Sequence, residues 1–202
     1  MKNMGLNIIV ICFAYFFAQS MVFGGIVGSA HDFSTEGWSG GKICQPCHTP
    51  HTSDLSVSDA PLWDHSATTA AFSMYDSPTM VVQPETEPQG VSKLCLSCHD
   101  GTIALDSFGG NVGSENISGT ADLTPDLSDD HPVSVQWKHQ NDTAPCSNCH
   151  FAHGELFSSK LPFYNGFVEC ATCHDVHNSE NLPKLLRKPM QSSEICFHCH
   201  GK

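Results

Sequence analysis

The chain has 202 residues, among them 9 basic and 21 acidic side chains, 13 histidines and 11 cysteines. Its net formal charge of −12 argues against nucleic acid and anionic lipid surfaces as partners, because both are themselves negatively charged. No apolar run after the first 20 residues resembles a membrane span, so we expect no integral membrane segment once the leader is removed.

The first 20 residues are typical of a secretory signal peptide. Lys2 is followed by the ten-residue apolar run Ile8 to Phe17, which is too short to cross a bilayer as a helix. Ala18 and Ser20 place small residues at positions −3 and −1 of a cleavage site. We expect cleavage after Ser20, with Ala30 as the alternative. The mature residues 21–202 would then be exported, to the cell surface, the extracellular space or the periplasm.

Five copies of the pattern C-x-x-C-H organise the rest of the chain. Two thiols on one helical turn can form thioether bonds to the two vinyl groups of one haem, and the next imidazole can bind the iron from the same side. We therefore expect five covalently attached c-type haems. The expected thioether residues are Cys44, Cys47, Cys95, Cys98, Cys146, Cys149, Cys170, Cys173, Cys196 and Cys199, and the expected proximal iron ligands are His48, His99, His150, His174 and His200.

Zinc sites and disulfide scaffolds are the alternatives for a cysteine-rich chain. Ten of the 11 cysteines lie in the five motifs and the remaining one, Cys12, lies in the leader, so none is left over for a structural disulfide. Zinc binds its ligands in sets of four, and five cysteine pairs with five histidines divide badly into such sets. Both alternatives are therefore disfavoured.

The mature chain offers about 36 residues for each haem, which is too few to wrap every cofactor in its own apolar shell. The haems must then pack against one another and form most of the core. This shortage predicts a mostly irregular fold with short α-helices and little or no β-sheet. The motifs begin at residues 44, 95, 146, 170 and 196, so residues 21–140 hold two haems with long loops and residues 141–202 hold three closely spaced haems.

Few regular elements are expected along the chain. Residues 22–27 favour a strand-like arm that leads into a glycine-rich loop, and residues 92–96 favour a short helix that carries the second motif. Gly, Asn, Ser and Thr make residues 109–124 a loop. Pro162, Pro183 and Pro189 keep the later elements short.

Eight histidines lie outside the proximal positions and are candidates for the second axial ligand of each iron. Three of them follow a proximal histidine by three residues, in the extended pattern C-x-x-C-H-x-x-H. The proximal bond holds such a segment on the near side of its own haem, so the extra imidazole can reach only a neighbouring haem. One short segment would then ligate two irons and fix their separation. These candidates are His51, His153 and His177.

Further distal candidates stand alone in the sequence. His65 follows Trp63, which could pack on a porphyrin face, and His131 is stiffened by the proline that follows it. His31 is a further candidate and His139 a weaker one, whereas His198 lies inside a motif and should meet solvent or a propionate. Histidines outnumber the axial positions, so we expect two histidines on every iron and no open coordination site for a substrate.

Several strings resemble the small multihaem cytochromes of metal-reducing bacteria, among which are outer-surface cytochromes that polymerise into conductive filaments. These strings are HDFS from His31, CHTPH, PLWDH, CLSCHDGTIA, DHPVS, CATCHDVH and the closing ICFHCH. The resemblance implies a continuous stack of haems with two histidine ligands each, and electron transfer out of the cell. In filament-forming members one iron takes its distal histidine from the N-terminal region of the next subunit, a role that His31 matches by position.

Three functions follow from these patterns. The first is electron conduction with other redox proteins or further copies of the chain as partners. The second is a soluble periplasmic shuttle, similar to the pentahaem redox partner of cytochrome c nitrite reductase. The third, a reductase, is disfavoured because the catalytic subunit of that enzyme carries a C-x-x-C-K motif and this chain has none.

Overall fold

The computed structural model describes residues 25–80, 82–137 and 161–200. In this part of the chain the backbone is mostly irregular, which confirms the predicted fold class. Among the described residues, no helix has the length and apolar character needed to cross a membrane. The helices are α2 (Gly90–His99), α3 (Cys170–Cys173) and α4 (Glu194–Phe197), the strands are β1 (Val135–Gln136) and β2 (Phe167–Val168), and the 3-10 turns are η1 (Phe33–Thr35), η2 (Gly37–Ser39), η3 (Gly119–Ala121), η5 (Pro183–Leu185) and η6 (Gln191–Ser193).

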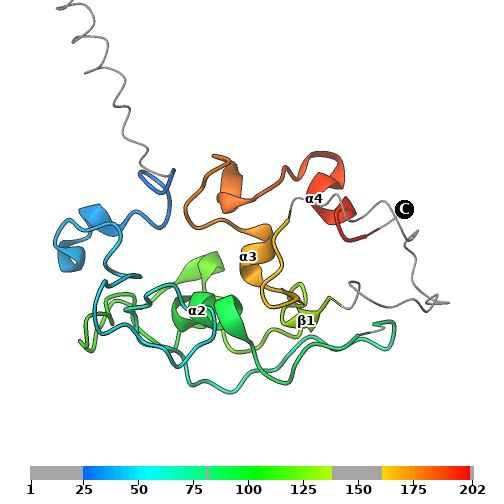
Figure 1. Cartoon of the computed structure of the whole chain (residues 1–202), viewed down its shortest axis with the longest axis horizontal. Coiled ribbons are helices and arrows are strands. Elements are labelled where there is room, and N and C mark those ends of the chain that lie inside the picture. The colour runs from blue at the N-terminus through cyan, green and yellow to red at the C-terminus, as the bar shows by residue number, and fades with distance from the viewer. Residues whose placement is uncertain (1–24, 81, 138–160, 201–202) are drawn as a thin grey trace, which may run out of the picture.

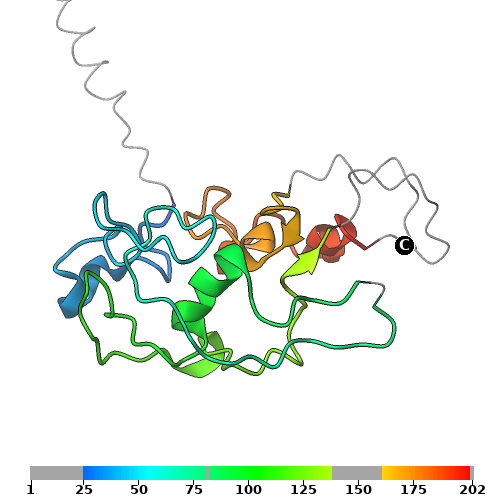
Figure 2. The same cartoon turned by 60° about the horizontal axis from the view of Figure 1, so that its bottom comes forward.

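Helices α2 and α3 lie side by side near the centre of the described structure. The N-terminal turns η1 and η2 lie toward one end, and α4 lies toward the other (Figures 1 and 2). Because α2 carries the second motif, α3 the fourth and α4 part of the fifth, the motifs are spread along the length of the molecule.

Helix α2 confirms the prediction of a helix that carries the second motif. It buries Leu94 and Leu96 and ends at His99. Gly101 follows in the left-handed region at φ 71°, which favours glycine and stops the helix directly after the motif. The proximal histidine therefore stands at the end of a rigid element.

The N-terminal arm differs from its prediction. Residues 25–27 form turns, so the predicted strand is wrong there, while residues 22–24 lie outside the described residues. Asn178 donates its side-chain N–H to the carbonyl of Gly25 (3.1 Å), and a Cβ at Gly25 would collide with the Asn178 backbone. The glycine thus permits a close approach that holds the arm on the turn after the fourth motif.

The two strands form one short antiparallel sheet. Val135 pairs with Val168 and Gln136 with Phe167. Directly after β1, the ring of Trp137 stacks on that of Phe163, with centroids 5.0 Å apart. This sheet joins the segment before the third motif to the segment before the fourth.

The interior of the described chain contains more polar than hydrophobic side chains. Eight hydrophobic side chains are buried, against eleven polar or charged ones. Val57, Trp63 and Leu94 make up a small apolar cluster. A protein core of this size supplies little hydrophobic stabilisation, so the fold depends on other interactions.

A buried carboxylate connects the second and fourth motifs. Glu169 caps α3 in a capping box with Thr172, and it accepts hydrogen bonds from the hydroxyls of Ser92 in α2 and of Ser134 (3.1 Å). Ser92 in turn accepts the backbone N–H of Cys170 (2.9 Å). Burial raises the pKa of Glu169, although its hydrogen bonds with Ser92 and Ser134 offset part of this effect. These hydrogen bonds therefore link α2 to the start of α3.

Substitution of Glu169 by alanine should destabilise the holoprotein. The change removes the common acceptor of Ser92 and Ser134 and leaves buried donors unpaired, which costs about 2–4 kcal/mol of unfolding free energy. Guanidinium denaturation followed by circular dichroism would measure this loss. Glu87→Ala, at an exposed position, is the matched control and should change stability by less than about 0.5 kcal/mol.

The pH dependence of stability should show the raised pKa of Glu169. Because the folded state holds this proton more tightly than the unfolded chain, the contribution of Glu169 is fully present below its ordinary pKa of 4.5 and is lost as the pH rises through the folded value. Glu169→Gln should lack this slope when unfolding free energies are compared across that window. Parallel pH profiles for the two proteins would contradict the assignment.

Candidate haem-binding motifs

Each described motif folds as a single helical turn. The backbone N–H of its histidine donates to the carbonyl of its first cysteine, which is the i to i−4 bond of an α-helix. Both thiols and the imidazole of a motif are thereby set on one short, stiff segment. The donor–acceptor pairs outside α2 are His48–Cys44 (2.9 Å), His174–Cys170 (3.0 Å) and His200–Cys196 (2.8 Å), and the second motif lies within α2.

The thiols of the described motifs form no disulfide bonds, since all eight described cysteines are free. Across residues 25–80, 82–137 and 161–200, no three His, Cys, Asp or Glu side chains gather as a metal site. Each described motif therefore holds two free thiols one helical turn apart, as haem attachment requires.

Burial perturbs the thiols of the first two motifs. It raises the pKa of Cys47 to about 11 and that of Cys98 to about 12, and in both cases a neighbouring cysteine adds to the shift. A hydrogen bond with Cys170, together with burial, raises the pKa of the Cys95 thiol. Thiols from three different motifs therefore lie close together at the centre of the molecule.

Three proximal histidines are anchored through the same ring atom. The Nδ1 atoms of His48, His99 and His174 lie 2.6, 2.7 and 2.9 Å from the carbonyl oxygens of Pro61, Ala121 and Lys184. A carbonyl oxygen can only accept, so Nδ1 carries the proton and the lone pair remains on Nε2. Each imidazole is thus held in the tautomer that binds a metal through Nε2.

The first and fourth motifs share one further pattern of backbone hydrogen bonds. In the first motif, the backbone N–H of Asp64 donates to the carbonyl of the residue before the proximal histidine (3.0 Å). The backbone N–H of the residue after that histidine donates to the carbonyl of Leu62 (2.8 Å). In the fourth, Arg187 and Leu185 occupy the equivalent positions, at 2.8 and 2.7 Å. Leu62 and Leu185 both have positive φ, 55° and 57°. The first and fourth motifs therefore share the same local backbone structure.

Three proximal histidines each face a candidate distal histidine across a similar gap. The ring centroids of His48 and His177 are 6.2 Å apart with a 13° interplanar angle. Those of His99 and His31 are 5.9 Å apart at 51°, and those of His200 and His131 are 6.2 Å apart at 83°.

This separation is the one expected for two imidazoles on opposite sides of one metal. Each metal–nitrogen bond is about 2 Å long and each ring adds about 1 Å, which together place the centroids about 6 Å apart. The nearly parallel rings of His48 and His177 are too far apart for direct face-to-face stacking at about 3.5–4 Å. The separation is therefore compatible with two axial ligands of a single iron, and direct aromatic contacts, with centroids about 4.5–7 Å apart, include it as well.

The Nδ1 atoms of two of the candidate distal histidines are placed differently. His131 has its Nδ1 atom 3.1 Å from the Pro132 carbonyl, which directs the proton to that nitrogen. His31 has a buried Nδ1 atom without a hydrogen-bond partner. Burial, with smaller contributions from His99 and His174, lowers the pKa of His31 to about 4, so its ring is neutral at physiological pH.

The remaining candidates are placed differently. His65 is buried, with its ring nitrogens 2.9 Å from the carbonyls of Ser66 and Ala104, and its Nε2 atom lies 3.6 Å from the Cys98 thiol. His51 is exposed and His198 is half-buried. The third motif and two distal candidates, namely Cys146, Cys149, His150, His153 and His139, lie outside the described residues.

The described motifs follow one another in space in the order of the sequence. Cys47 of the first motif affects the pKa of Cys95 and Cys98 in the second, and Cys95 bonds to Cys170 in the fourth. Cys173 of the fourth motif lies near Cys196 and Cys199 of the fifth. The fourth motif therefore lies between the second and the fifth.

Sequence reasoning did not identify the groups that orient the histidines. The carbonyls of Pro61, Ala121 and Lys184 are backbone atoms, and their residues have no shared side-chain chemistry. Asp175, directly after a proximal histidine, is buried and faces His177. The string CHDVH contains both residues, but the pattern alone does not show that they interact.

Comparison with known proteins supports the interpretation of the motifs. Residues 161–202, which contain the fourth and fifth copies, match the family described as doubled CXXCH motif. None of the curated proteins compared with the chain matches it. The chain has the features of a multihaem c-type cytochrome. Its paired thiols, its facing imidazoles and its sparse protein core all fit covalently bound haem.

Removal of a distal histidine should leave one iron with an open position. In the haem-loaded protein, His177→Ala should convert one low-spin haem to high spin, because the ring that faces His48 is lost. Electron paramagnetic resonance and the visible charge-transfer bands would detect it. His198→Ala, which changes a histidine with no expected axial role, should leave the spectrum low-spin. A low-spin spectrum in both variants would contradict the pairing of His48 with His177.

Proposed function

We propose that this cytochrome carries electrons along a closely packed chain of five covalently attached haems, each with two histidine ligands, for electron transfer outside the cytoplasm. Haem iron supplies reversible one-electron chemistry, and its axial ligands set the potential within a range of about 0.8 V. The facing histidine pairs support the proposal most directly, because an iron with both axial positions filled transfers electrons without binding a substrate.

We assign the axial ligands from these pairs. His177 would serve the iron held by His48, His31 the iron held by His99, and His131 the iron held by His200. Two bis-histidine irons would then be linked by one short segment, because His174 and His177 are three residues apart and face different haems. The distal ligands of the third and fourth irons would come from the remaining candidates, His51, His65, His153 and His139.

Such linkage explains how a short chain keeps haems close. A segment that ligates two irons cannot move relative to either, so the distance between the irons is set by three residues of backbone. Helices α2 and α3, locked through Glu169, hold the second and fourth motifs in the same way. Short distances between haem edges are the condition for fast electron passage.

The ligand pairs bear on the choice between a filament and a self-contained carrier. His31, the residue that resembles a ligand donated between subunits, faces His99 of its own chain, and His200 of the last motif has His131 of its own chain beside it. The same pairs are compatible with the second candidate function, a soluble periplasmic shuttle that donates electrons to a reductase, because they need no second copy of the chain. In that case the chain would work as a monomer with a redox protein as its partner.

Analysis of the native exported protein would test the proposal. We expect an intact mass that includes five haems and lacks residues 1–20, and only low-spin haem in the resting spectrum. Cell fractionation and electron microscopy of the same material would distinguish surface filaments from periplasmic monomers. A mass without added haem would overturn the assignment, and a resting high-spin haem would favour an enzyme.

His31 provides a direct test of the assembly. If its ring serves the His99 iron in the same chain, His31→Ala should create one high-spin haem in a monomer at any protein concentration. If the ring is donated between subunits, wild-type monomers should already contain the high-spin haem, and its signal should disappear on polymerisation. Absorbance spectra over a dilution series, with His198→Ala as control, separate these outcomes.

A further inference from the structure

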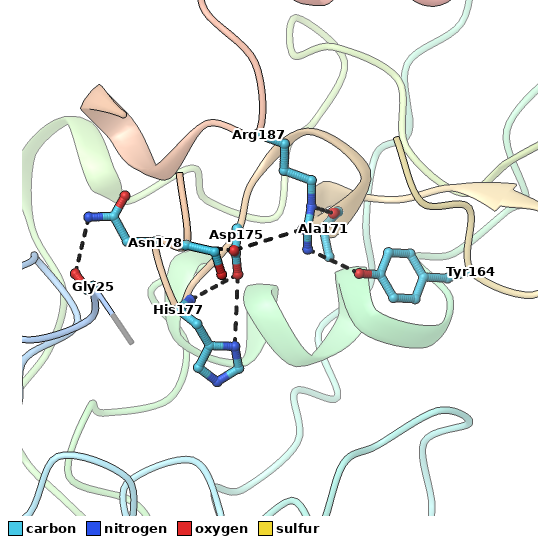
Figure 3. A network of polar contacts seen from close by, with 8 residues as sticks. Gly25, Tyr164, Ala171, Asp175, His177, Asn178 and Arg187 are labelled. Atoms are coloured by element: carbon cyan, nitrogen blue, oxygen red, sulfur yellow. Dashed lines mark hydrogen bonds and ion pairs between the residues drawn. The ribbon is translucent and has the colours of Figure 1, made fainter. Parts of the chain in front are cut away.

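We propose that Asp175 is a positioning residue that orients His177 and lowers the reduction potential of the iron between His177 and His48, with Arg187 as its counter-charge. This inference rests on the proposed function. Asp175 is not itself an iron ligand. It comes directly after the proximal histidine of the fourth motif, whereas the iron that it would affect is held by the first motif. The network is shown in Figure 3.

Asp175 lies inside the turn that connects two ligands of different haems. Its carboxylate accepts the backbone N–H groups of His177 (3.1 Å) and Ser179 (3.0 Å), while its own backbone N–H donates to Leu185 (2.7 Å). The side chain is only 8% exposed. The turn that carries His177 is thus built around this carboxylate.

The carboxylate also faces the ring of His177. The His177 Nδ1 atom lies 3.8 Å from Asp175 Oδ1, on the nitrogen that is not needed for iron (Figure 3). With Nε2 on the iron, the ring proton would be on Nδ1, the nitrogen nearer the carboxylate. At 3.8 Å the carboxylate acts on the ring through its charge, which increases the electron donation of the imidazole to the metal.

Arg187 balances the buried negative charge. Its guanidinium lies 3.9 Å from Asp175 Oδ2 on the side away from His177. It is held in place by bonds to the Ala171 carbonyl (2.8 Å) and to the Tyr164 hydroxyl (3.3 Å). Because Ala171 lies inside the fourth motif, the counter-charge is fixed to the same haem-binding turn.

The two charges should act on the iron in opposite directions. A negative charge near the distal ligand stabilises the ferric state, which carries one more positive charge than the ferrous state, and so lowers the potential. The positive charge of Arg187 weakens this effect. A purely structural role would predict the same direction of change for loss of either residue, since both would loosen one turn.

Potentiometric titration of the haem-loaded variants, followed by visible absorbance and electron paramagnetic resonance, tests the proposal. Asp175→Asn should shift the potential of one of the five haems upward, and Arg187→Gln should shift the same haem downward. Asp175→Glu should restore a value close to wild type. Asp175→Ser offers a second charge-free variant, because a serine hydroxyl can also accept the N–H groups of a turn.

Asp126→Asn is the matched control. Asp126 also accepts a backbone N–H within a turn, from Ser128 (3.2 Å), but at an exposed site. It loses the same charge and should leave all five potentials unchanged. This control separates the local effect at His177 from the general effect of a less acidic surface.

The outcomes distinguish this inference from the proposed function. If the wild-type protein lacks five low-spin haems, the proposed function fails first. If it has them and the potentials stay the same in both Asp175→Asn and Arg187→Gln, or move in the same direction, the role of Asp175 is overturned. If the charge-free Asp175 variants fail to load haem, the downward shift in Arg187→Gln still decides the question.

Discussion

The hydrogen bond from a proximal imidazole to a distant backbone carbonyl is the interaction on which the arrangement of the motifs depends. The C-x-x-C-H turn is local, and by itself it would leave each imidazole free to rotate. The carbonyls of Pro61, Ala121 and Lys184 remove that freedom and come from segments 13, 22 and 10 residues away from the histidines that they hold. Each cofactor site is therefore closed by a loop, which ties the irregular backbone to the chemistry of the site.

Buried polar groups take the place of a conventional core in the described part of the chain. Glu169 joins the helices of the second and fourth motifs, and Asp100, directly after the second motif, accepts from the hydroxyls of Thr68 (2.5 Å) and Thr102 (2.8 Å). Such networks are specific because an unpaired member is costly. They hold loops in fixed positions with few apolar residues.

The sequence predicted the parts of this structure that depend on local spacing. Haem attachment motifs, a mostly irregular backbone and the helix that ends at His99 all follow from short patterns, and the structure places His177 beside another motif, where its three-residue spacing from His174 allows it to reach. The pairing of His31 with His99 and of His131 with His200 could not be predicted, since it depends on contacts between distant segments. The backbone carbonyls that anchor the rings have no side-chain signature. The strand at residues 25–27 was wrong because glycine favoured a close turn over an extended arm.

Charge and ligation together limit how copies of this chain can interact. Residues 21–202 contain eight basic and 21 acidic side chains, a net formal charge of −13, and haem propionates would add to it. Like-charged copies repel one another over about 10 Å at moderate ionic strength, so a homopolymer must gain its contacts against this repulsion. A histidine donated between subunits would provide such a contact. On the proposed function, the same negative charge would attract a redox partner that has a basic patch.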